Sequence, residues 1–389
     1  MTREEACSKI DEAIANFNVK GQLIEKRPYG NGHINDTFLL VYREESHSCK
    51  KYILQRMNHE IFKNTQELME NIIGVTSYLR GQILKSGGDP ERETLNFVPT
   101  LSGDSYYVDS TKNAWRMCGF IVDTICLDAV NTAQDFYQSA VAFGNFQRLL
   151  SNYPAQTLHE TIVNFHNTVS RFEDFKRAVH ADVCGRAKEV EAEIKFAMDR
   201  ENDVAVLVNM QAAGELPLRV THNDTKLNNV LLDSKTGRAI CVIDLDTVMP
   251  GLAVNDFGDS IRFGASTGLE DEQDLSKIAL DLNLFDIYTK GFLEACGNSL
   301  LKQEIEMLPT GAKMMTFECG IRFLADYLQG DVYFKTSRDQ QNLDRCRTQF
   351  KLVAEMEQKM NQMDQIVKKY LEKQDGSAQD ILFENKISK

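Results

Sequence analysis

The chain has 389 residues, of which 42% are hydrophobic and 26% are charged, so it is long enough to form two lobes with substantial cores. Its formal net charge of -13 argues against partners such as nucleic acid or an anionic membrane, because phosphate groups attract basic surfaces. No stretch approaches the ~18 consecutive apolar residues that span a bilayer, and the N-terminus lacks a signal-peptide pattern.

The first ~120 residues are predicted to form a small β-rich lobe. Apolar spacing predicts an amphipathic helix over residues 5–17, and residues 60–85 also favour a helix. Apolar and aromatic runs predict strands at 38–42, 52–56, 96–99, 105–108 and 114–121. Strands around one helix are typical of a nucleotide-binding lobe, to which we assign residues 1–120.

A glycine-containing segment precedes the first of these strands. In Tyr29-Gly30-Asn31-Gly32-His33, the glycines lack the Cβ that would keep backbone N–H groups away from phosphates. Gly30, Asn31 and Gly32 are therefore candidate nucleotide-binding residues. A plain hairpin turn explains the same letters, because a single Gly-x-Gly is weak evidence.

The rest of the chain is predicted to be mainly helical. Residues 121–372 form the predicted second lobe, and its last long helix carries a methionine-rich stripe typical of core packing. Residues 373–389 are polar and are expected to form a loose tail. The nine cysteines are scattered without a C-x-x-C pair, which favours reduced thiols and a cytoplasmic protein.

The most informative segment is Thr221-His222-Asn223-Asp224-Thr225-Lys226-Leu227-Asn228-Asn229, followed by Asp244. His-x-Asp followed by Asn is the catalytic-loop pattern in which the Asp takes a substrate hydroxyl proton and the Asn binds Mg²⁺. Short strands before and after the loop, a turn at 234–237 and an apolar run at 239–243 would bring Asp224, Asn229 and Asp244 to one end of a small sheet. A surface loop without chemistry is the alternative, and this layout argues against it.

A second candidate metal motif is less well placed. Asp256-Phe257-Gly258 resembles the metal-binding triplet of protein kinases, but it lies beyond the hairpin strand that ends at Asp244. We therefore interpret Asp256 and Asp259 as structural residues that cap a helix or fix a loop at residues 262–264. Asp246 is the second-choice metal ligand.

The expected strand lysine is missing. A protein kinase has an apolar pair followed by Lys at this point, whereas this chain has Gln55 followed by Arg56, which would face the other side of a regular strand. Either another cation serves or Mg²⁺ neutralises more of the phosphate charge. Glu67 and Glu70 lie on the following helix, where the partner carboxylate of the lysine would sit.

The chain resembles the aminoglycoside phosphotransferase/choline kinase superfamily, and within it the bacterial N-acetylhexosamine 1-kinases. The resemblance runs from about Glu25 to Tyr370. It rests on Pro28-Tyr29-Gly30-Asn31-Gly32-His33-Ile34-Asn35, Tyr52-Ile53-Leu54-Gln55-Arg56-Met57-Asn58, the segment 219–229, Ile243-Asp244-Leu245-Asp246-Thr247, Asp256-Phe257-Gly258-Asp259-Ser260 and Glu318-Cys319-Gly320-Ile321-Arg322-Phe323-Leu324-Ala325-Asp326-Tyr327-Leu328. It includes Gln55 in place of the lysine.

This resemblance implies an α+β, protein-kinase-like two-lobed fold, with a small β-rich N-lobe and a larger, mainly helical C-lobe. It also implies ATP- and Mg²⁺-dependent phosphorylation of N-acetylglucosamine or N-acetylgalactosamine at the anomeric C1 hydroxyl, and it does not call for a protein partner. By analogy, Asp224 is the base and also contacts the sugar, and Asn229 and Asp244 bind Mg²⁺. The positions that line the sugar site in this family are His33, Phe263, Arg322 and Tyr333.

Other interpretations stay open from the residues alone. Arg322 could form a buried ion pair with Asp326, and Tyr333 could belong to the core. The acceptor could be another small alcohol, such as an unacetylated sugar, an aminoglycoside or an amino alcohol. The missing lysine also allows a pseudokinase that binds nucleotide without turnover, although the presence of Asp224, Asn229 and Asp244 argues against it.

Overall fold

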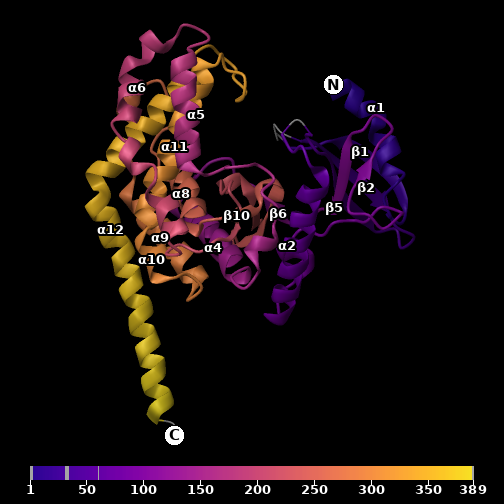
Figure 1. Ribbon diagram of the computed structural model, residues 1–389. Coiled ribbons are helices and arrows are strands. Elements are labelled where there is room, and N and C mark those ends of the chain that lie inside the picture. The colour runs from indigo at the N-terminus through magenta and orange to yellow at the C-terminus, as the bar shows by residue number, and fades with distance from the viewer. Residues whose placement is uncertain (1–2, 31–34, 60, 388–389) are drawn as a thin grey trace.

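The computed structural model describes residues 3–30, 35–59 and 61–387, and these form two lobes with the two chain ends on different lobes (Figure 1). Among the described residues, the N-terminal lobe carries a five-stranded antiparallel sheet and the C-terminal lobe is mainly helical. This confirms the predicted α+β, protein-kinase-like fold.

The N-lobe sheet has the strand order β1-β2-β3-β5-β4. Its strands are β1 (Gln22–Pro28), β2 (Asp36–Arg43), β3 (Cys49–Arg56), β4 (Tyr107–Val108) and β5 (Ala114–Gly119). The predicted strand at 96–99 is wrong, because Phe97 makes only an isolated bridge to Cys118. The predicted strand at 105–108 is shortened to the two residues of β4.

Three helices accompany this sheet: α1 (Arg3–Ile14), α2 (Thr65–Lys85) and α3 (Pro90–Glu93). Helix α1 buries Ile10 and Ala13 against alternate residues of β2, including Leu40, as the strand period of two requires. Helix α2 instead packs its apolar face in a cluster that includes Phe146 and Val220 of the C-lobe. The second cluster therefore joins the two lobes.

The C-lobe helices pack around a continuous apolar core. Helix α4 packs on α9, and α11 packs on α5, α8 and α12. Helices α8 and α11 approach each other so closely that a Cβ built on Gly258 would lie 2.4 Å from the carbonyl oxygen of Gly311. The helices are α4 (Ala133–Leu149), α5 (Thr168–Ala181), α6 (Glu191–Met198), α7 (Val206–Ala212), α8 (Ala253–Gly264), α9 (Leu282–Cys296), α10 (Lys302–Glu306), α11 (Leu308–Leu328) and α12 (Gln341–Ile387).

Two small sheets lie between the N-lobe sheet and the helical core. One has the order β6-β8-β9, and in the other β7 pairs with β10. The strands are β6 (Thr124–Ile125), β7 (Arg219–Thr221), β8 (Val230–Asp233), β9 (Ala239–Val242) and β10 (Met249–Gly251). The predicted strand before the loop and the hairpin after it are confirmed as β7 and β8–β9, whereas β6, the first strand after the N-lobe sheet, was not predicted.

The C-terminal segment differs from its prediction. The expected loose tail at 373–389 is wrong for its described part, because α12 continues to Ile387 and extends beyond the body of the C-lobe (Figure 1). A polar composition does not distinguish an exposed helix from a coil, and only the apolar stripe further upstream marked this helix in the sequence.

The eight cysteines whose side chains the structure describes are free. No helix within residues 3–30, 35–59 and 61–387 is long and apolar enough to cross a membrane.

Candidate active site

The loop after β7 is fixed to the end of strand β9 by a buried histidine. His222 packs edge-on against the rings of Phe143 and Phe146, and its Nε2 donates to the carbonyl oxygen of Ile243 at 2.8 Å. Its Nδ1 accepts the backbone N–H of Asp224 at 3.3 Å. Because a carbonyl only accepts, the proton belongs on Nε2, and His222 holds both the loop and the strand end as a neutral ring.

Side chains of helix α8 anchor the same loop. The Asp256 carboxylate accepts the backbone N–H groups of His222 at 2.9 Å and Asn223 at 2.8 Å. Asp259 accepts the backbone N–H of Thr225 at 2.9 Å. These bonds agree with the structural interpretation of both aspartates, but the detail differs. They project from inside α8 to receive loop amides, and they cap no helix.

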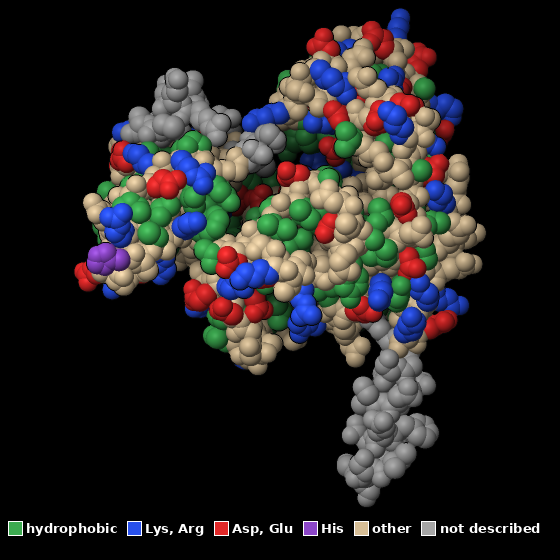
Figure 2. Space-filling model, turned by 180° about the vertical axis from the view of Figure 1, so that it is seen from behind, with side chains coloured by type: hydrophobic (Ala, Val, Ile, Leu, Met, Phe, Trp, Pro, Cys, Tyr) green, Lys and Arg blue, Asp and Glu red, His purple; other side chains and the backbone are tan. Residues whose placement is uncertain are grey.

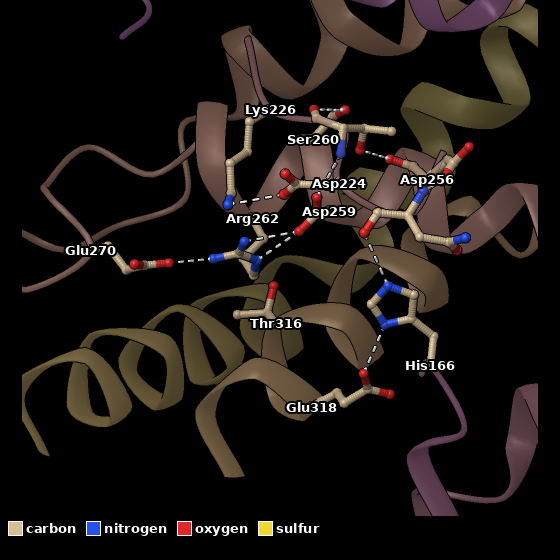
Figure 3. A network of polar contacts seen from close by, with 12 residues as sticks. His166, Asp224, Lys226, Asp256, Asp259, Ser260, Arg262, Glu270, Thr316 and Glu318 are labelled. Carbon is tan, nitrogen blue, oxygen red and sulfur yellow. Dashed lines mark hydrogen bonds and ion pairs between the residues drawn. The ribbon is translucent and has the colours of Figure 1, made fainter. Parts of the chain in front are cut away.

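Residues 262–264 were expected to form a loop, and this was wrong because they are the last residues of α8. Arg262 is buried there and donates from Nε and Nη2 to Asp259 at 3.1 and 2.9 Å, and from Nη1 to Glu270 at 2.7 Å (Figure 3). Burial lowers the hydration of Asp259, yet its positive neighbours Arg262 and Lys226 keep its pKa below the usual value. Asp259 therefore stays an anionic acceptor for the loop.

Asp224 is partly open to the cleft and already contacts two other loop residues. Asn229 Nδ2 donates to its Oδ2 at 3.0 Å and to its backbone oxygen at 2.8 Å. Lys226 Nζ lies 2.9 Å from Asp224 Oδ1, and this carboxylate raises the pKa of Lys226 (Figure 3). The predicted base and the predicted Asn ligand are thus direct neighbours, with a cation beside them that the sequence analysis did not single out.

Asp244 follows β9 with a left-handed backbone, φ 59°, which Asp tolerates better than most residues. Its side chain opens to the cleft, yet the surrounding protein removes enough hydration to raise the pKa of Asp244 to about 6. The carboxylates of Asp246 and Asp224 add to this rise. The structure therefore brings Asp244 into the electrostatic range of the other predicted residues.

This cluster suits a hard divalent cation. The Asn229 amide nitrogen is used by Asp224, so its amide oxygen is the atom left for a ligand role. The repulsion from neighbouring carboxylates that helps to raise the pKa of Asp244 is relieved when a cation binds beside it. No group of three or more His, Cys, Asp and Glu side chains in the described part of the chain forms a complete metal cage. A cation held by Asn229 and Asp244 would need ligands from phosphate and water as well.

The position of the missing lysine is occupied by a hydrogen-bonded pair. Gln55 on β3 lies opposite Arg116 on β5, and Arg116 Nε donates to Gln55 Oε1 at 3.0 Å. Arg116 Nη1 also makes a short hydrogen bond and ion pair with Asp246. Of the two helix carboxylates considered for this place, Glu70 binds His159 and Gln66 instead.

Arg56 and Asp246 also have clear places. Arg56 donates to Asp36 of β2, as its alternate position on β3 predicts. Asp246, the second-choice metal ligand, is buried and spends its oxygens on Arg116 and on Asn35 Nδ2, which lies at 2.6 Å. Because both carboxylate oxygens of Asp246 already have partners, this residue is poorly suited to bind a metal ion.

On the acceptor side, Arg322 on α11 stands between two aromatic rings. Its guanidinium carbon lies 5.3 Å from the ring centre of Phe165 and 5.6 Å from that of Phe334. The alternative of a buried ion pair with Asp326 is wrong, because Asp326 has other partners. The Asp326 carboxylate accepts the backbone N–H groups of residues 332–334 and the amide of Asn342. A partly exposed guanidinium that lies beside two aromatic rings is suited to bind ligand oxygens.

The remaining predicted sugar-site positions are less constrained. Tyr333 is 60% exposed, so the alternative that it belongs to the core is wrong. Its ring packs edge-on against that of Phe334, with 4.8 Å between the ring centres. Phe263 is half-buried near the end of α8. His33 lies outside the described residues.

The glycine segment is described only in part. Asn31 and Gly32, like His33, lie outside the described residues, whereas Gly30 has φ +74°. Of the described residues on either side, Tyr29 donates its backbone N–H to the carbonyl oxygen of Thr37 at 2.9 Å. The nucleotide-binding role of Gly30, Asn31 and Gly32 stays a prediction.

His166 was not identified from the sequence. Its Nδ1 lies 2.8 Å from Glu318 Oε1, and its Nε2 lies 3.3 Å from the backbone oxygen of Asn223 (Figure 3). It therefore connects α11 to the residue before Asp224. No spacing rule marks such a contact, because 57 residues separate His166 from Asn223.

The segment that follows β9 lies where the two lobes meet. Figure 2 shows a hollow between the lobes, with acidic side chains visible within it. Asp246 of the C-lobe accepts hydrogen bonds from Asn35 and Arg116 of the N-lobe, which fixes the relation of the two sides at this point.

Comparison with known proteins gives the same picture. The model of the phosphotransferase enzyme family matches residues 26–288, which is more than half of the chain and includes Asp224, Asn229 and Asp244. Among solved structures, a microcompartment-associated aminopropanol kinase is 14% identical with a TM-score of 0.60, over 92% of this chain and 98% of that one.

Two further structures are similar. An aminoglycoside phosphotransferase from Alicyclobacillus acidocaldarius is 12% identical with a TM-score of 0.57, over 94% of this chain and 96% of that one. The amicoumacin kinase hAmiN, in complex with AMP-PNP, Ca²⁺ and Ami, is 12% identical with a TM-score of 0.57, over 92% and 96%. At these identities the likeness establishes the fold alone.

Proposed function

This chain belongs to the phosphotransferase enzyme family, and we propose that within it the protein is an N-acetylhexosamine 1-kinase. It transfers the γ-phosphoryl group of ATP to the anomeric hydroxyl of N-acetylglucosamine or N-acetylgalactosamine in the presence of Mg²⁺. The products are the N-acetylhexosamine 1-phosphate and ADP.

The observation that carries the reaction class is the contact of Asp224 with Asn229 at 3.0 Å, in a loop fixed by Asp256 and His222. Asp224 orients the acceptor hydroxyl and takes its proton as the sugar oxygen bonds to the γ-phosphorus. The bond from that phosphorus to the β–γ bridging oxygen breaks, and this oxygen leaves with ADP. An anomeric hydroxyl is more acidic than an ordinary alcohol, so a carboxylate suffices as the base.

The other charged groups support the same transfer. Mg²⁺, when bound, supplies positive charge that offsets the charge of the phosphates. Asn229 and Asp244 are the residues that would hold it. Lys226, which lies 2.9 Å from Asp224, places a fixed positive charge on the acceptor side of the phosphoryl group.

The acceptor class rests on the family resemblance together with the arginines of the C-lobe. Arg322 has aromatic rings on its sides and does not pair with Asp326, and Arg171 is close enough for Arg322 to lower its pKa, after burial as the larger cause. Two neighbouring guanidinium groups disfavour a cationic acceptor such as choline or an aminoglycoside, and they suit the hydroxyl and carbonyl oxygens of a neutral sugar.

The test is ³¹P NMR of reactions that contain ATP, Mg²⁺ and one acceptor from a panel. The panel holds N-acetylglucosamine, N-acetylgalactosamine, unacetylated hexoses, choline and an aminoglycoside. We expect a sugar 1-phosphate signal with the N-acetylhexosamines. Turnover of another acceptor alone would keep the phosphotransferase and overturn the substrate, and no turnover of any acceptor would support the pseudokinase.

The matched control is Asp224→Asn, which keeps the size of the side chain and removes the base. We expect it to lose nearly all turnover while it still binds Mg²⁺ and AMP-PNP. Full activity in this variant would remove Asp224 from the mechanism.

A further inference from the structure

A phosphotransferase of this fold needs a fixed positive charge on the N-lobe side of the phosphates, and in protein kinases a strand lysine supplies it. Position 55 carries a neutral glutamine instead. Another described residue would have to bring positive charge to this point of the cleft.

Arg116 is held at this point by its neighbour. It lies directly across from Gln55 in the antiparallel register of β3 and β5, so the two side chains leave the same face of the sheet. Gln55 Nε2 donates to Thr37 Oγ1 at 3.2 Å, which leaves Gln55 Oε1 to accept Arg116 Nε at 3.0 Å. The neutral glutamine thus orients the guanidinium without pairing its charge, and the carboxylate that pairs with it belongs to Asp246.

The guanidinium then points across the boundary between the lobes. Its Nη1 contacts the Asp246 carboxylate, and both side chains are buried, with 4% and 5% of their surfaces exposed. The Asp244 carboxylate also lies close enough to act on the pKa of Arg116, although Asp246 acts more strongly. Arg116 therefore sits beside the end of the strand that carries the predicted metal ligand.

Asp246 also accepts a hydrogen bond from a second N-lobe residue. Asn35 Nδ2 donates to it at 2.6 Å, and Asn35 Oδ1 accepts the backbone N–H of Asn58 at 3.0 Å. Asn35 directly precedes strand β2. One C-lobe carboxylate thus joins Asn35, Arg116 of the N-lobe sheet and the end of β9.

The neighbouring cations are committed elsewhere. Arg56 faces Asp36, with Nε to Oδ2 at 2.8 Å. Lys226 lies on the other side of the cleft, against Asp224. Lys51 lies over the ring of Phe120 at 5.8 Å, in the segment that connects the lobes.

We propose that Arg116, oriented by Gln55, takes the place of the strand lysine: it supplies the fixed charge for the nucleotide phosphates and, through Asp246, couples the N-lobe to the metal-ligand end of β9. A buried ion pair between lobes is costly unless both partners are fully hydrogen-bonded, and this pair has such partners in Gln55 and Asn35. The inference rests on the proposed function only in requiring that the chain binds a nucleotide with Mg²⁺.

The test measures binding of Mg²⁺ and AMP-PNP by calorimetry, which needs no acceptor. The variants are Arg116→Gln, the double variant Gln55→Lys/Arg116→Gln, and Arg56→Gln as a control. Arg56→Gln also removes an N-lobe arginine from an ion pair, but this arginine follows Gln55 on β3 and pairs with Asp36. Thermal unfolding of each variant by circular dichroism shows whether it is folded.

We expect Arg116→Gln to weaken nucleotide binding at least tenfold, and the double variant to recover at least threefold of that loss because it returns the charge from position 55. Arg56→Gln should bind within twofold of the unmodified chain. If Arg116→Gln is unfolded, the double variant decides, since it again offers Asp246 a cation.

Several outcomes would overturn the inference. They are unchanged binding by folded Arg116→Gln, a folded double variant that binds no better than Arg116→Gln or fails to bind, equal losses in Arg56→Gln, or unfolding of both Arg116 variants. Failure of the unmodified chain to bind Mg²⁺ and AMP-PNP would instead remove the proposed function together with its premise. The two failures are therefore distinguishable.

Discussion

Asp256 offers the sharpest test of how helix α8 positions the catalytic loop. Its carboxylate is 1% exposed, and three donors converge on it. Oδ1 accepts the backbone N–H of Asn223 at 2.8 Å, whereas Oδ2 accepts the backbone N–H of His222 and the Nε2 of Gln147, both at 2.9 Å. Burial raises the pKa of Asp256, but these hydrogen bonds oppose the rise.

Asp256→Asn replaces one of the two oxygens by a donor of the same size. The less costly orientation retains the oxygen that faces His222 and Gln147 and turns the new NH₂ toward the backbone N–H of Asn223. One buried donor then loses its acceptor, and two hydrogen bonds lose their charge. Together these changes should lower the free energy of unfolding by about 2–4 kcal/mol.

The activity should fall further than this stability loss requires. Asn223 directly precedes Asp224, so repulsion at its N–H displaces the base, and a shift of about 1 Å in a catalytic group costs on the order of 100-fold in rate. We expect kcat to fall by about 100-fold. The assay combines guanidinium unfolding with initial rates on the acceptor that the NMR panel identifies.

Gln147→Leu is the matched control. It removes the third donor of Asp256 and its weaker bond to the carbonyl oxygen of Val220 at 3.2 Å, but it keeps both loop amides paired. It should cost about 1–2 kcal/mol of stability and change kcat less than threefold. A folded Asp256→Asn variant with unchanged kcat would refute the reasoning. So would a Gln147→Leu variant that is equally inactive.

Three further predictions concern separate regions. Gly258→Ala should destabilise the C-lobe by about 3 kcal/mol or more in guanidinium unfolding, since its Cβ would meet the carbonyl oxygen of Gly311 at 2.4 Å; an unchanged midpoint would contradict this packing. Burial alone would raise the pKa of Asp109, but hydrogen bonds, led by that from Trp115 Nε1, lower it to about 2. Because the folded pKa lies below the usual value of 3.8, the contribution of Asp109 to stability is complete above pH 4 and should disappear between about pH 4 and pH 2. Asp109→Asn should be less stable at pH 7 and should lose less stability across that pH range. Equal slopes of the free energy of unfolding against pH in the two proteins would refute this role of Asp109. Arg322→Met, which keeps the apolar contact with the rings, should raise the KM for the acceptor at least tenfold and leave the KM for ATP within threefold, and the reverse pattern in steady-state kinetics would place Arg322 outside the acceptor site.

The catalytic loop could be read from the sequence because its residues are close along the chain. Asp224 and Asn229 are five residues apart, and a predicted hairpin carries the chain from there to Asp244. Local spacing and strand patterning therefore sufficed to place the three together. The same patterning failed at residues 96–99, where an apolar run lies beside the sheet without a ladder of its own.

Lys226 shows that the partners of a side chain can stay unpredicted even within a segment that the sequence identifies. It lies in the catalytic loop, two residues after Asp224, so its position was available from the sequence. Its ion pair at 2.9 Å depends on the loop conformation, which Asp256 and Asp259 of α8 impose. The sequence identified those aspartates as structural, but it did not reveal that the loop amides are what they bind.

The sequence by itself determined the two-lobed fold class, the position of the predicted catalytic loop and the membership of the phosphotransferase family, because each depends on residues that are neighbours in the chain or on periodic patterns. Only the tertiary structure decided the partners of Gln55, Asp246 and Arg322. Arg116 is 61 residues from Gln55 and 130 from Asp246, and strand register and lobe contact bring these side chains together. Such pairings are set by how whole elements pack, and no local pattern in the chain records them.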